Sequence, residues 1–472
     1  MFSHKLSLSD PNMNEPQDSY SLDILGQQPD LAGYIQICSC FPLTDTSSHS
    51  AIINILTHGL ERLSANFPWV AGQIVNEGAS DANSGIFTIK PLEKIPCLVV
   101  KDLRDDPSMP TMDVIRQSNF PFSMLDESVI APRRTFTGND YQSACDSEPV
   151  FLLQATFITG GLLLTFLGHH QAMDMTGQGQ IMHLLSKACR NEQFTTEELS
   201  SGNLIHHDLI PFFDDSYKLG DELAHRIVKP TPSKPISDDH NTAPPPNCTW
   251  AYFIFSPTSL SVLKSFATKS TMLSSGYIST DDVLTAFIWQ STIRARLPRL
   301  NPTAESTLAR AVDSRRYLNI PQTYTGVVNN LVYHTYQLQE LVDEPLGRIA
   351  SQLRSAVDPK TSDIGYRTRA LATFLNRSPV KNVISVTATL DPTVDIIFSS
   401  WAKVNCYQLD FNLGLGKPEA VRRPQFVPLE GLILFMPKAL DGEISVAICL
   451  RDEDMKRLRA DQEFAKYGKY IG

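Results

Sequence analysis

Apolar runs alternate with helix-spaced apolar residues along the first half of the chain. Strands are predicted where aliphatic and aromatic runs are bounded by polar or turn-forming residues, at 34–41, 85–90, 97–101, 151–159 and 162–167. The last two strands meet at Gly160-Gly161, a dipeptide typical of a tight β-hairpin. A helix is predicted over 47–63, where apolar residues recur at helical spacing.

The second half shows the same alternation. A strand is predicted over 250–255 and a helix over 260–268. The segment STDDVLTAFIWQSTIRARL (279–297) predicts another helix, which Ser279 or Thr280 caps and which is apolar on nearly all sides. Such a helix should be buried. Because strand and helix signals alternate in both halves, the sequence predicts an α/β protein.

A proline-rich segment separates the two halves. The chain has 472 residues, more than one hydrophobic core normally holds. Residues 229–247 contain six prolines and almost no apolar residues, which indicates a linker. We therefore expect a disordered extension over 1–21, an N-terminal domain over 22–228, a crossover linker over 229–247 and a C-terminal domain over 248–472.

Charge and composition exclude several classes of function. The formal net charge is −10 and no basic run occurs, so nucleic acid is a poor partner. The strongest apolar stretches, such as 161–168, are far shorter than the roughly 20 residues of a membrane span. The eight cysteines are scattered, form no metal-binding CxxC pair and follow no signal peptide. We expect a cytoplasmic monomer with no bound metal and no membrane contact.

The main candidate for chemistry is the pentapeptide His170-Gln171-Ala172-Met173-Asp174. It lies where a predicted buried strand ends and a helix begins, with Thr176 as a candidate helix cap. A neutral imidazole held at a strand end is suited to take a proton from an alcohol near pH 7. Spacing alone is weak evidence, and the alternative is a structural histidine with Asp174 capping the next helix.

Other catalytic signatures are absent from the sequence. It contains no GxSxG elbow, HExxH pair, Walker-type phosphate loop or strand-linked GxGxxG. The segment from Gly414 to Lys417 resembles a phosphate loop only superficially, because no second glycine stands at the Walker spacing. Serine hydrolase, zinc peptidase and nucleotide-binding functions therefore lose support.

Several motifs in order resemble the BAHD family of coenzyme A-dependent acyltransferases. The resemblance rests on HxxxD at 170–174 and on a late DFNLGLGKP (410–418), which is similar to the family's DFGWG although two residues longer. Secondary motifs agree in position: FPWVAGQ (67–73), STDDVLTAFIW (279–289), AVDSR (311–315) and SSW (399–401). The segments around them are most similar to the fungal branch of the family that acetylates trichothecenes.

This resemblance implies a fold and a set of roles. Family members have two similarly folded, chloramphenicol-acetyltransferase-like domains, each a mixed sheet flanked by helices, with the active-site channel at their junction. The motif histidine, here His170, is the general base. The motif aspartate, here Asp174, pairs with the arginine of VDxR, here Arg315, in a structural role. Asp410 would hold the domains and the coenzyme channel together, and His169 is expected to pack.

The resemblance also implies a co-substrate, acetyl-CoA, and no permanently bound cofactor. The residues that it places along the coenzyme, together with four candidate phosphate-binding cations, are Ser256, Lys264, Ser279, Thr280, Ser399, Ser400, Trp401, Lys417, Arg422 and Arg423. The acceptor that it implies is a terpenoid alcohol, a trichothecene esterified at its 3-hydroxyl.

Two alternatives remain at this point. One is an O- or N-acyltransferase that uses another fungal secondary metabolite, and the other is an inactive relative that binds coenzyme A or a terpenoid without turnover. The joint presence of His170, Asp174 and Arg315 argues against the inactive relative.

Overall fold

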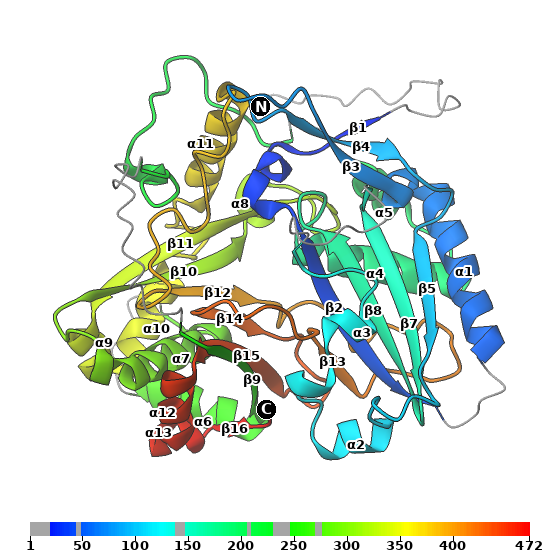
Figure 1. The fold of residues 1–472 in the computed structure, drawn as a ribbon. Coiled ribbons are helices and arrows are strands. Elements are labelled where there is room, and N and C mark those ends of the chain that lie inside the picture. Colours follow the sequence, from blue (N-terminus) through cyan, green and yellow to red (C-terminus); the bar gives the residue numbers. More distant parts are fainter. Residues whose placement is uncertain (1–18, 44–48, 137–146, 205–208, 230–245, 270–275) are drawn as a thin grey trace, which may run out of the picture.

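A five-stranded sheet leads the chain to His170. In the computed structural model, which describes residues 19–472 apart from 44–48, 137–146, 205–208, 230–245 and 270–275, this sheet occupies one half of the molecule (Figure 1). Its strands, in spatial order, are β13 (Ala420–Arg422), β2 (Tyr34–Pro42), β8 (Gly161–His169), β7 (Phe151–Ile158) and β5 (Cys97–Asp102). The pair β5–β7 is parallel and the others are antiparallel, so the sheet is mixed.

The hairpin of β7 and β8 is the centre of this half. It turns at Gly160, whose φ of 78° is a conformation that glycine adopts without strain. Every residue of both strands is buried, as expected for strands covered on both faces. The helices α1 (His49–Asn66) and α4 (Met175–Cys189) share one apolar core with these strands. The short helix α2 (Met112–Gln117) belongs to a second cluster with the β7–β8 hairpin.

A seven-stranded mixed sheet forms the other half. Its strands, in spatial order, are β11 (Asn329–Gln337), β10 (Glu305–Asp313), β12 (Ile396–Ser400), β14 (Leu432–Phe435), β15 (Ile444–Arg451), β9 (Cys248–Phe255) and β16 (Gly468–Tyr470). Helix α7 (Thr280–Arg296) packs on it and is buried at 14 of its 17 positions, as its apolar sequence predicts.

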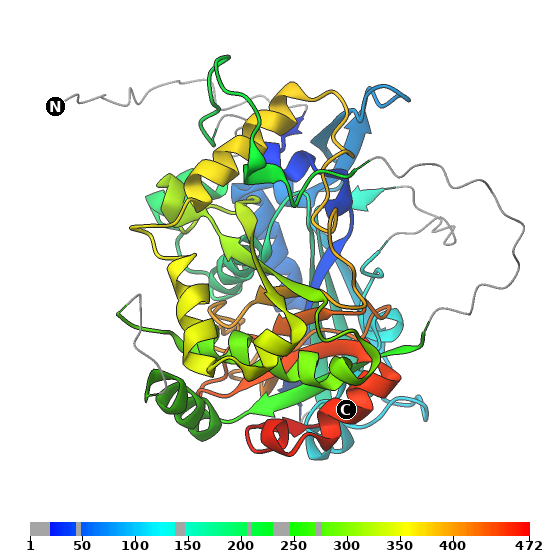
Figure 2. The same cartoon turned by 90° about the vertical axis from the view of Figure 1, so that its left-hand side faces the viewer.

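Further helices cover this half of the molecule. They are α6 (Pro257–Lys269), α9 (Leu338–Asp343), α10 (Leu346–Ser355), α11 (Ile364–Arg377), α12 (Asp452–Ala460) and α13 (Gln462–Ala465). Seen from the side, the yellow and red helices lie in front of the blue strands of the first half (Figure 2). The remaining helices are α3 (Glu127–Ile130), α5 (Thr196–Gly202) and α8 (Arg315–Leu318).

Folded structure begins earlier than the sequence predicts. A third sheet contains β1 (Tyr20–Ser21), β4 (Ile86–Pro91), β3 (Gly72–Glu77) and β6 (Glu148–Pro149), in this order. Tyr20 pairs with Ile89, so the predicted disordered extension over 1–21 is wrong at its last two residues. Residues 1–18 lie outside the described part of the chain, as do residues 230–245 of the predicted linker.

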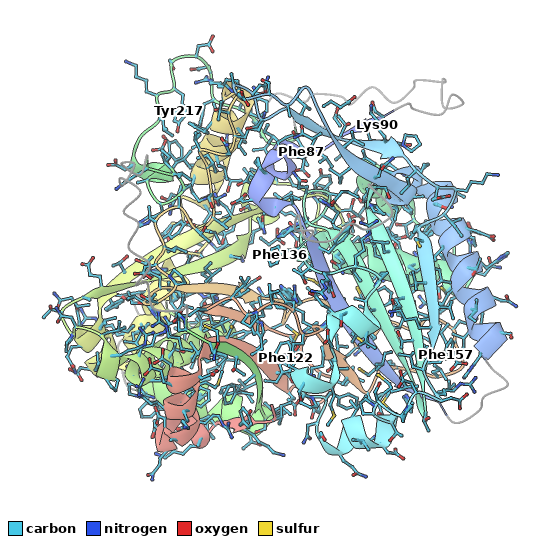
Figure 3. All side chains as sticks on the ribbon, in the orientation of Figure 1. Phe87, Lys90, Phe122, Phe136, Phe157 and Tyr217 are labelled. Atoms are coloured by element: carbon cyan, nitrogen blue, oxygen red, sulfur yellow. The ribbon has the colours of Figure 1, made fainter. Side chains whose placement is uncertain are left out.

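The two halves share structure at their junction. Strand β13, from the second half of the sequence, pairs with β2 in the first sheet, with Val421 opposite Ser39. Phe122, from the first half, stacks on Tyr252 of β9 with ring centroids 3.9 Å apart (Figure 3). The division at 228 and 248 stays a prediction, while the α/β class with two mixed sheets is confirmed.

Candidate active site at the junction

His170 follows directly on the last residue of β8. Its main-chain N–H donates to the carbonyl of Gly33 at 2.8 Å, which fixes the start of the loop. Its ring Nδ1 lies 3.3 Å from the carbonyl oxygen of Met173. Because a carbonyl only accepts, this contact places the proton on Nδ1 and leaves the lone pair on Nε2. Nε2 is thus the nitrogen that can act as a base.

The surroundings of His170 keep its imidazole neutral. Desolvation of the ring lowers the pKa of His170 below its ordinary value of 6.5. Hydrogen bonding and the negative charge of Asp174 act in the opposite direction without cancelling the effect. A base with a lowered pKa is unprotonated at neutral pH.

Both carboxylate oxygens of Asp174 accept hydrogen bonds from other groups of the protein. Its two oxygens lie 2.9 and 3.0 Å from Nη1 and Nη2 of Arg315. Its Oδ2 also accepts from the main-chain N–H of Val328, and its Oδ1 from that of Gly177. The structure thus contains the ion pair that the resemblance implies, in a bidentate geometry that holds both groups tightly.

The contact with Gly177 corrects one expectation about helix α4. Asp174, not Thr176, is the N-cap residue, and the helix begins at Met175. Asp174 therefore both caps helix α4 and pairs with Arg315. A carboxylate at this position also interacts favourably with the positive end of the helix dipole.

Arg315 is buried and fully engaged. It donates to the carbonyls of Tyr324 and Gly326 at 3.1 and 2.7 Å, and to Asp313 at 3.0 Å. Burial by itself would lower the pKa of Arg315, but the carboxylates of Asp174 and Asp313 outweigh it and raise the pKa. A charged pair this deeply buried joins the histidine loop to the second half of the chain.

His169 has a contact of its own. It is buried, and its Nε2 lies 3.0 Å from Oε2 of Glu148 in β6. Its ring also packs edge-on against Tyr34 at a centroid distance of 5.2 Å. These contacts agree with a packing role next to the reactive histidine.

A cavity of about 580 Å³ lies next to the ion pair of Asp174 and Arg315, between α4 and the second sheet. Thr176 and Gly179 of α4 form one wall, and Asp313 of β10 belongs to the opposite one. Four cationic side chains and two carboxylates, those of Asp281 and Asp313, line the cavity. The cations are Arg310, Arg316, Arg354 and Lys403.

These cations are of two kinds. Arg310 and Arg354 pair with the carboxylates at the start of α7, as Arg310 Nη1 lies 3.0 Å from Asp282 and Arg354 Nε lies 2.6 Å from it. Among the described residues, Arg316 and Lys403 have no carboxylate within ion-pair distance. Arg316 donates to the carbonyl of Val357 and to the hydroxyl of Tyr317, so its positive charge, like that of Lys403, is not neutralised by a carboxylate.

Only two of the ten residues predicted to bind coenzyme A line this cavity. Ser279 and Ser400 line it, with Ser279 capping α7 and Ser400 donating to Asp281. The other eight do not line it: Ser256, Lys264, Thr280, Ser399, Trp401, Lys417, Arg422 and Arg423. Ser256 instead accepts from the N–H of Ser259 at the start of α6.

Arg422 and Arg423 differ most from the prediction that they bind the phosphates of the coenzyme. Arg422 and Arg423 are 3% and 5% exposed. Arg422 donates to main-chain carbonyls and lines a different groove of about 490 Å³. Arg423 stacks on Phe426 at 3.4 Å and donates to Thr135. Both guanidinium groups are thus used in contacts outside the cationic cavity.

Sequence reasoning missed Arg310, Arg316, Arg354 and Lys403. Three of them had a local signal, because Arg310 and Arg316 flank the AVDSR motif and Lys403 follows the SSW motif. Arg354 had none, since it reaches the cavity from α10 only through tertiary packing.

The late DFNLGLGKP motif contacts helix α4 and strand β8, the two elements on either side of the His170 loop. The carbonyl of Asp410 accepts from Arg190 at the end of α4, and its side chain accepts from the N–H of Asn412 at 2.8 Å. Phe411 is buried and stacks on Phe166 of β8. The motif thereby connects the second half of the chain to the strand and helix on either side of His170.

The described residues contain no group of three or more His, Cys, Asp or Glu side chains arranged to hold a metal ion. Within the same residues, every helix is too short or too polar to span a lipid bilayer.

The chain is similar to known acetyltransferases over nearly its whole length. The O-acetyltransferase dmxR13 of Cryptosporiopsis sp. is 58% identical over 96% of this chain and 97% of its own. The trichothecene 3-O-acetyltransferase TRI101 of Fusarium sporotrichioides is 50% identical over 96% and 97%. The crystal structure of F. graminearum TRI101 with coenzyme A and deoxynivalenol has a TM-score of 0.90 at 46% identity and covers 96% of this chain and 100% of that one.

Two family models also match the chain. One describes the trichothecene 3-O-acetyltransferase-like N-terminal domain and covers residues 34–189, and the other describes the Transferase family and covers residues 131–465. The second match alone extends over more than half of the sequence and includes the His170 loop, Arg315 and the DFNLGLGKP motif. The chain therefore belongs to the Transferase family of BAHD acyltransferases.

Proposed function

We propose that this protein transfers an acetyl group from acetyl-CoA to the 3-hydroxyl of a trichothecene, with His170 as the general base. The observation that carries the proposal is the division of labour within the HxxxD loop. Asp174 is fully engaged by Arg315 and two main-chain N–H groups, whereas Nε2 of His170 keeps its lone pair. Only the histidine can therefore accept a proton from substrate.

The reaction follows from this arrangement. Nε2 of His170 removes the proton of the acceptor hydroxyl, and the oxygen attacks the thioester carbonyl. The tetrahedral intermediate collapses, and the proton held on His170 passes to the departing coenzyme A thiolate. Holding both substrates at one base supplies much of the rate, because the reaction no longer depends on their chance encounter.

We place the coenzyme in the cationic cavity. Its phosphates need positive charge, and Arg316 and Lys403 supply it without an ion-pair partner of their own. The cavity reaches the histidine loop through Thr176 and the Arg315 partner Asp313. Ser279 and Ser400 remain in the proposed set, and the other eight sequence candidates keep only the support of their motifs.

The choice of acceptor rests on the relatives. Those at 50% and 48% identity are named trichothecene 3-O-acetyltransferases, and the structures of similar chains hold coenzyme A with deoxynivalenol or T-2. A second candidate is acetylation of a different fungal metabolite. It is favoured by the relative at 58% identity, whose name specifies an O-acetyltransferase and no trichothecene.

A product assay separates the two candidates. The full chain is incubated with acetyl-CoA and with one of three acceptors: deoxynivalenol, a trichothecene that lacks the 3-hydroxyl, or a phenylpropanoid alcohol. Thiol release is followed together with NMR of the product. A 3-monoacetate of deoxynivalenol with the highest kcat/KM supports the proposal. A higher kcat/KM for the phenylpropanoid alcohol overturns the trichothecene acceptor and keeps the reaction, whereas the absence of thiol release with all three acceptors overturns both.

We further infer a monomer in a reducing, cytoplasmic compartment. Six cysteines in the described part of the chain, Cys38, Cys40, Cys189, Cys248, Cys406 and Cys449, are in no disulfide, which fits such a compartment.

A further inference from the structure

Asp23 is a buried carboxylate at the N-terminal edge of the folded chain. It is 3% exposed and forms the N-cap of the short 3-10 helix η1 (Ile24–Gln27). Its Oδ1 accepts from the N–H of Gly26 at 2.9 Å. None of the motifs discussed above includes it, and it touches no cationic side chain in the described residues.

The other oxygen of Asp23 reaches a loop more than 300 residues away in sequence. Oδ2 accepts from the main-chain N–H of Val327 at 2.7 Å and from the hydroxyl of Tyr324 at 3.2 Å. The next N–H along the loop, that of Val328, donates to Asp174 at 2.9 Å. Two successive N–H groups of one loop therefore point to two different carboxylates.

This loop is also the one that holds Arg315. The carbonyls of Tyr324 and Gly326 accept from the guanidinium at 3.1 and 2.7 Å. Asp23 therefore fixes the loop on one side, while the pair of Arg315 and Asp174 fixes it on the other. Releasing Asp23 leaves the carbonyls that orient Arg315 without their support.

Asp23 acts on the histidine loop by a second route, through η1. A Cβ on Gly26 would lie 2.2 Å from the carbonyl oxygen of Gln171, so the two backbones are in direct contact. The side chain of Gln171 also reaches the carbonyl of Gln28 at 3.3 Å. Gln171 immediately follows His170, and the N–H of His170 itself binds Gly33 in the same N-terminal segment.

A purely space-filling role does not account for this residue. Burial raises the pKa of Asp23 to about 7, although three hydrogen bonds lower it in part. A buried carboxyl group without a cation costs stability, and an apolar or amide side chain would fill the space at less cost. What those side chains do not offer is acceptance from three donors on two segments at once.

We propose that Asp23 is a positioning residue for acetyl transfer, which holds the 324–328 loop and the main chain at Gln171 so that Arg315, Asp174 and His170 keep their mutual geometry. Asp23 does not line the cavity in which we place the coenzyme. The inference rests on the proposed function, because the geometry that it maintains is that of the proposed base. A displacement of about 1 Å at a reacting group costs on the order of a hundredfold in rate.

The test compares two buried aspartates. Asp23→Asn keeps the shape and removes one acceptor. Asp395→Asn is the matched control, because Asp395 is 8% exposed, accepts from the N–H groups of Thr307 and Asp391, and has a pKa that burial raises. Melting temperature, kcat and KM for acetyl-CoA are measured for wild type and both variants at a temperature where all are folded.

We expect Asp23→Asn to lower kcat by about tenfold or more and to leave KM for acetyl-CoA within about threefold, because Asp23 is not among the residues that line the cationic cavity. Asp395→Asn should lower the melting temperature and keep kcat. A kcat within about threefold of wild type for Asp23→Asn overturns the proposal, and so does an equal loss of kcat in both variants.

A second variant decides the matter if Asp23→Asn does not fold. Tyr324→Phe removes a single donor to Asp23 and leaves the carbonyl of Tyr324 on Arg315. A loss of kcat of about threefold or more with unchanged KM supports the proposal, and an unchanged kcat overturns it. An inactive wild type in the same assay would instead be a failure of the proposed function, and thus is distinguishable from a failure of Asp23.

Discussion

Arg315 contacts both carboxylate oxygens of Asp174, at 2.9 and 3.0 Å, across 141 residues of sequence. Both side chains are buried, Arg315 completely. The pair ties the loop that carries His170 to the strand β10 and its following loop in the other half of the molecule. The position of the base therefore depends on an interaction between the two halves.

Breaking this pair should destabilise the protein as well as slow it. Asp174→Asn removes the bidentate partner of the buried Arg315 charge and leaves it only the half-exposed Asp313, so we expect a loss of about 3–5 kcal/mol in the free energy of unfolding together with a large loss of kcat. Denaturant unfolding followed by fluorescence measures the first quantity. The control is Arg348→Ala, which removes a 62% exposed side chain from its pair with Glu344 and should cost less than about 1 kcal/mol. A fully stable but inactive Asp174→Asn protein would point to direct chemistry by Asp174.

Removal of the proposed base should affect rate alone. We expect His170→Ala to lower kcat by about 10²–10⁴ and to leave the melting temperature and coenzyme A affinity near wild type, because the ring makes a single hydrogen bond, 3.3 Å long, to the described residues. Single-turnover kinetics and calorimetric titration with coenzyme A provide the readouts. The matched change His58→Ala concerns a side chain that is 79% exposed and should have no effect. Activity of His170→Ala within threefold of wild type would remove the assignment.

The pH dependence of the reaction should report the desolvated imidazole. Since burial lowers the pKa of His170, the base stays unprotonated below the ordinary value of 6.5, and kcat/KM should fall only as the pH drops through that lowered pKa. A profile of kcat/KM from pH 5 to 9, with thiol release measured at each pH, tests the direction. An acid limb centred above 6.5 would contradict it.

The cationic cavity predicts that loss of one of its charges weakens the use of acetyl-CoA but not the use of a thioester without phosphates. Lys403→Ala should raise KM for acetyl-CoA by about tenfold, because an unpaired charge that meets a phosphate is lost. The same variant should use S-acetyl-N-acetylcysteamine, a thioester without phosphates, as well as wild type does. The exposed Lys438 lies outside the cavity, so Lys438→Ala is the control. Equal effects on both thioesters would show that the charge does not act on phosphate.

Asp23 predicts how stability changes with pH. Its pKa of about 7 in the folded state lies above the ordinary 3.8, so the folded chain holds the extra proton between these values. By linkage, its contribution to the free energy of unfolding decreases as the pH rises from about 4 to about 7, because ionisation inside the protein is unfavourable. Urea unfolding at pH 5 and pH 8 should show a smaller decrease for Asp23→Asn than for wild type. Equal decreases would argue that Asp23 is ionised throughout.

Local patterns predicted the elements that deliver His170 to its place. The all-apolar runs on either side of Gly160-Gly161 form the buried hairpin β7–β8, and the all-round apolar helix behind Ser279 is the buried α7. Such features follow from propensity and periodicity over a few neighbouring residues, which a sequence displays directly. The resemblance to a family then placed His170, Asp174 and Arg315 together.

Only the tertiary structure decided which distant groups meet. Arg422 and Arg423 look like free cations in sequence, yet both are buried in the folded chain. Arg354 looks no different from other surface charges, yet packing of α10 brings it to the cavity beside α4. Asp23 precedes a four-residue 3-10 helix that no sequence motif marks, and its partner Val327 lies 304 residues away. Contacts of this range depend on how whole sheets and loops pack, and no periodicity in the chain encodes them.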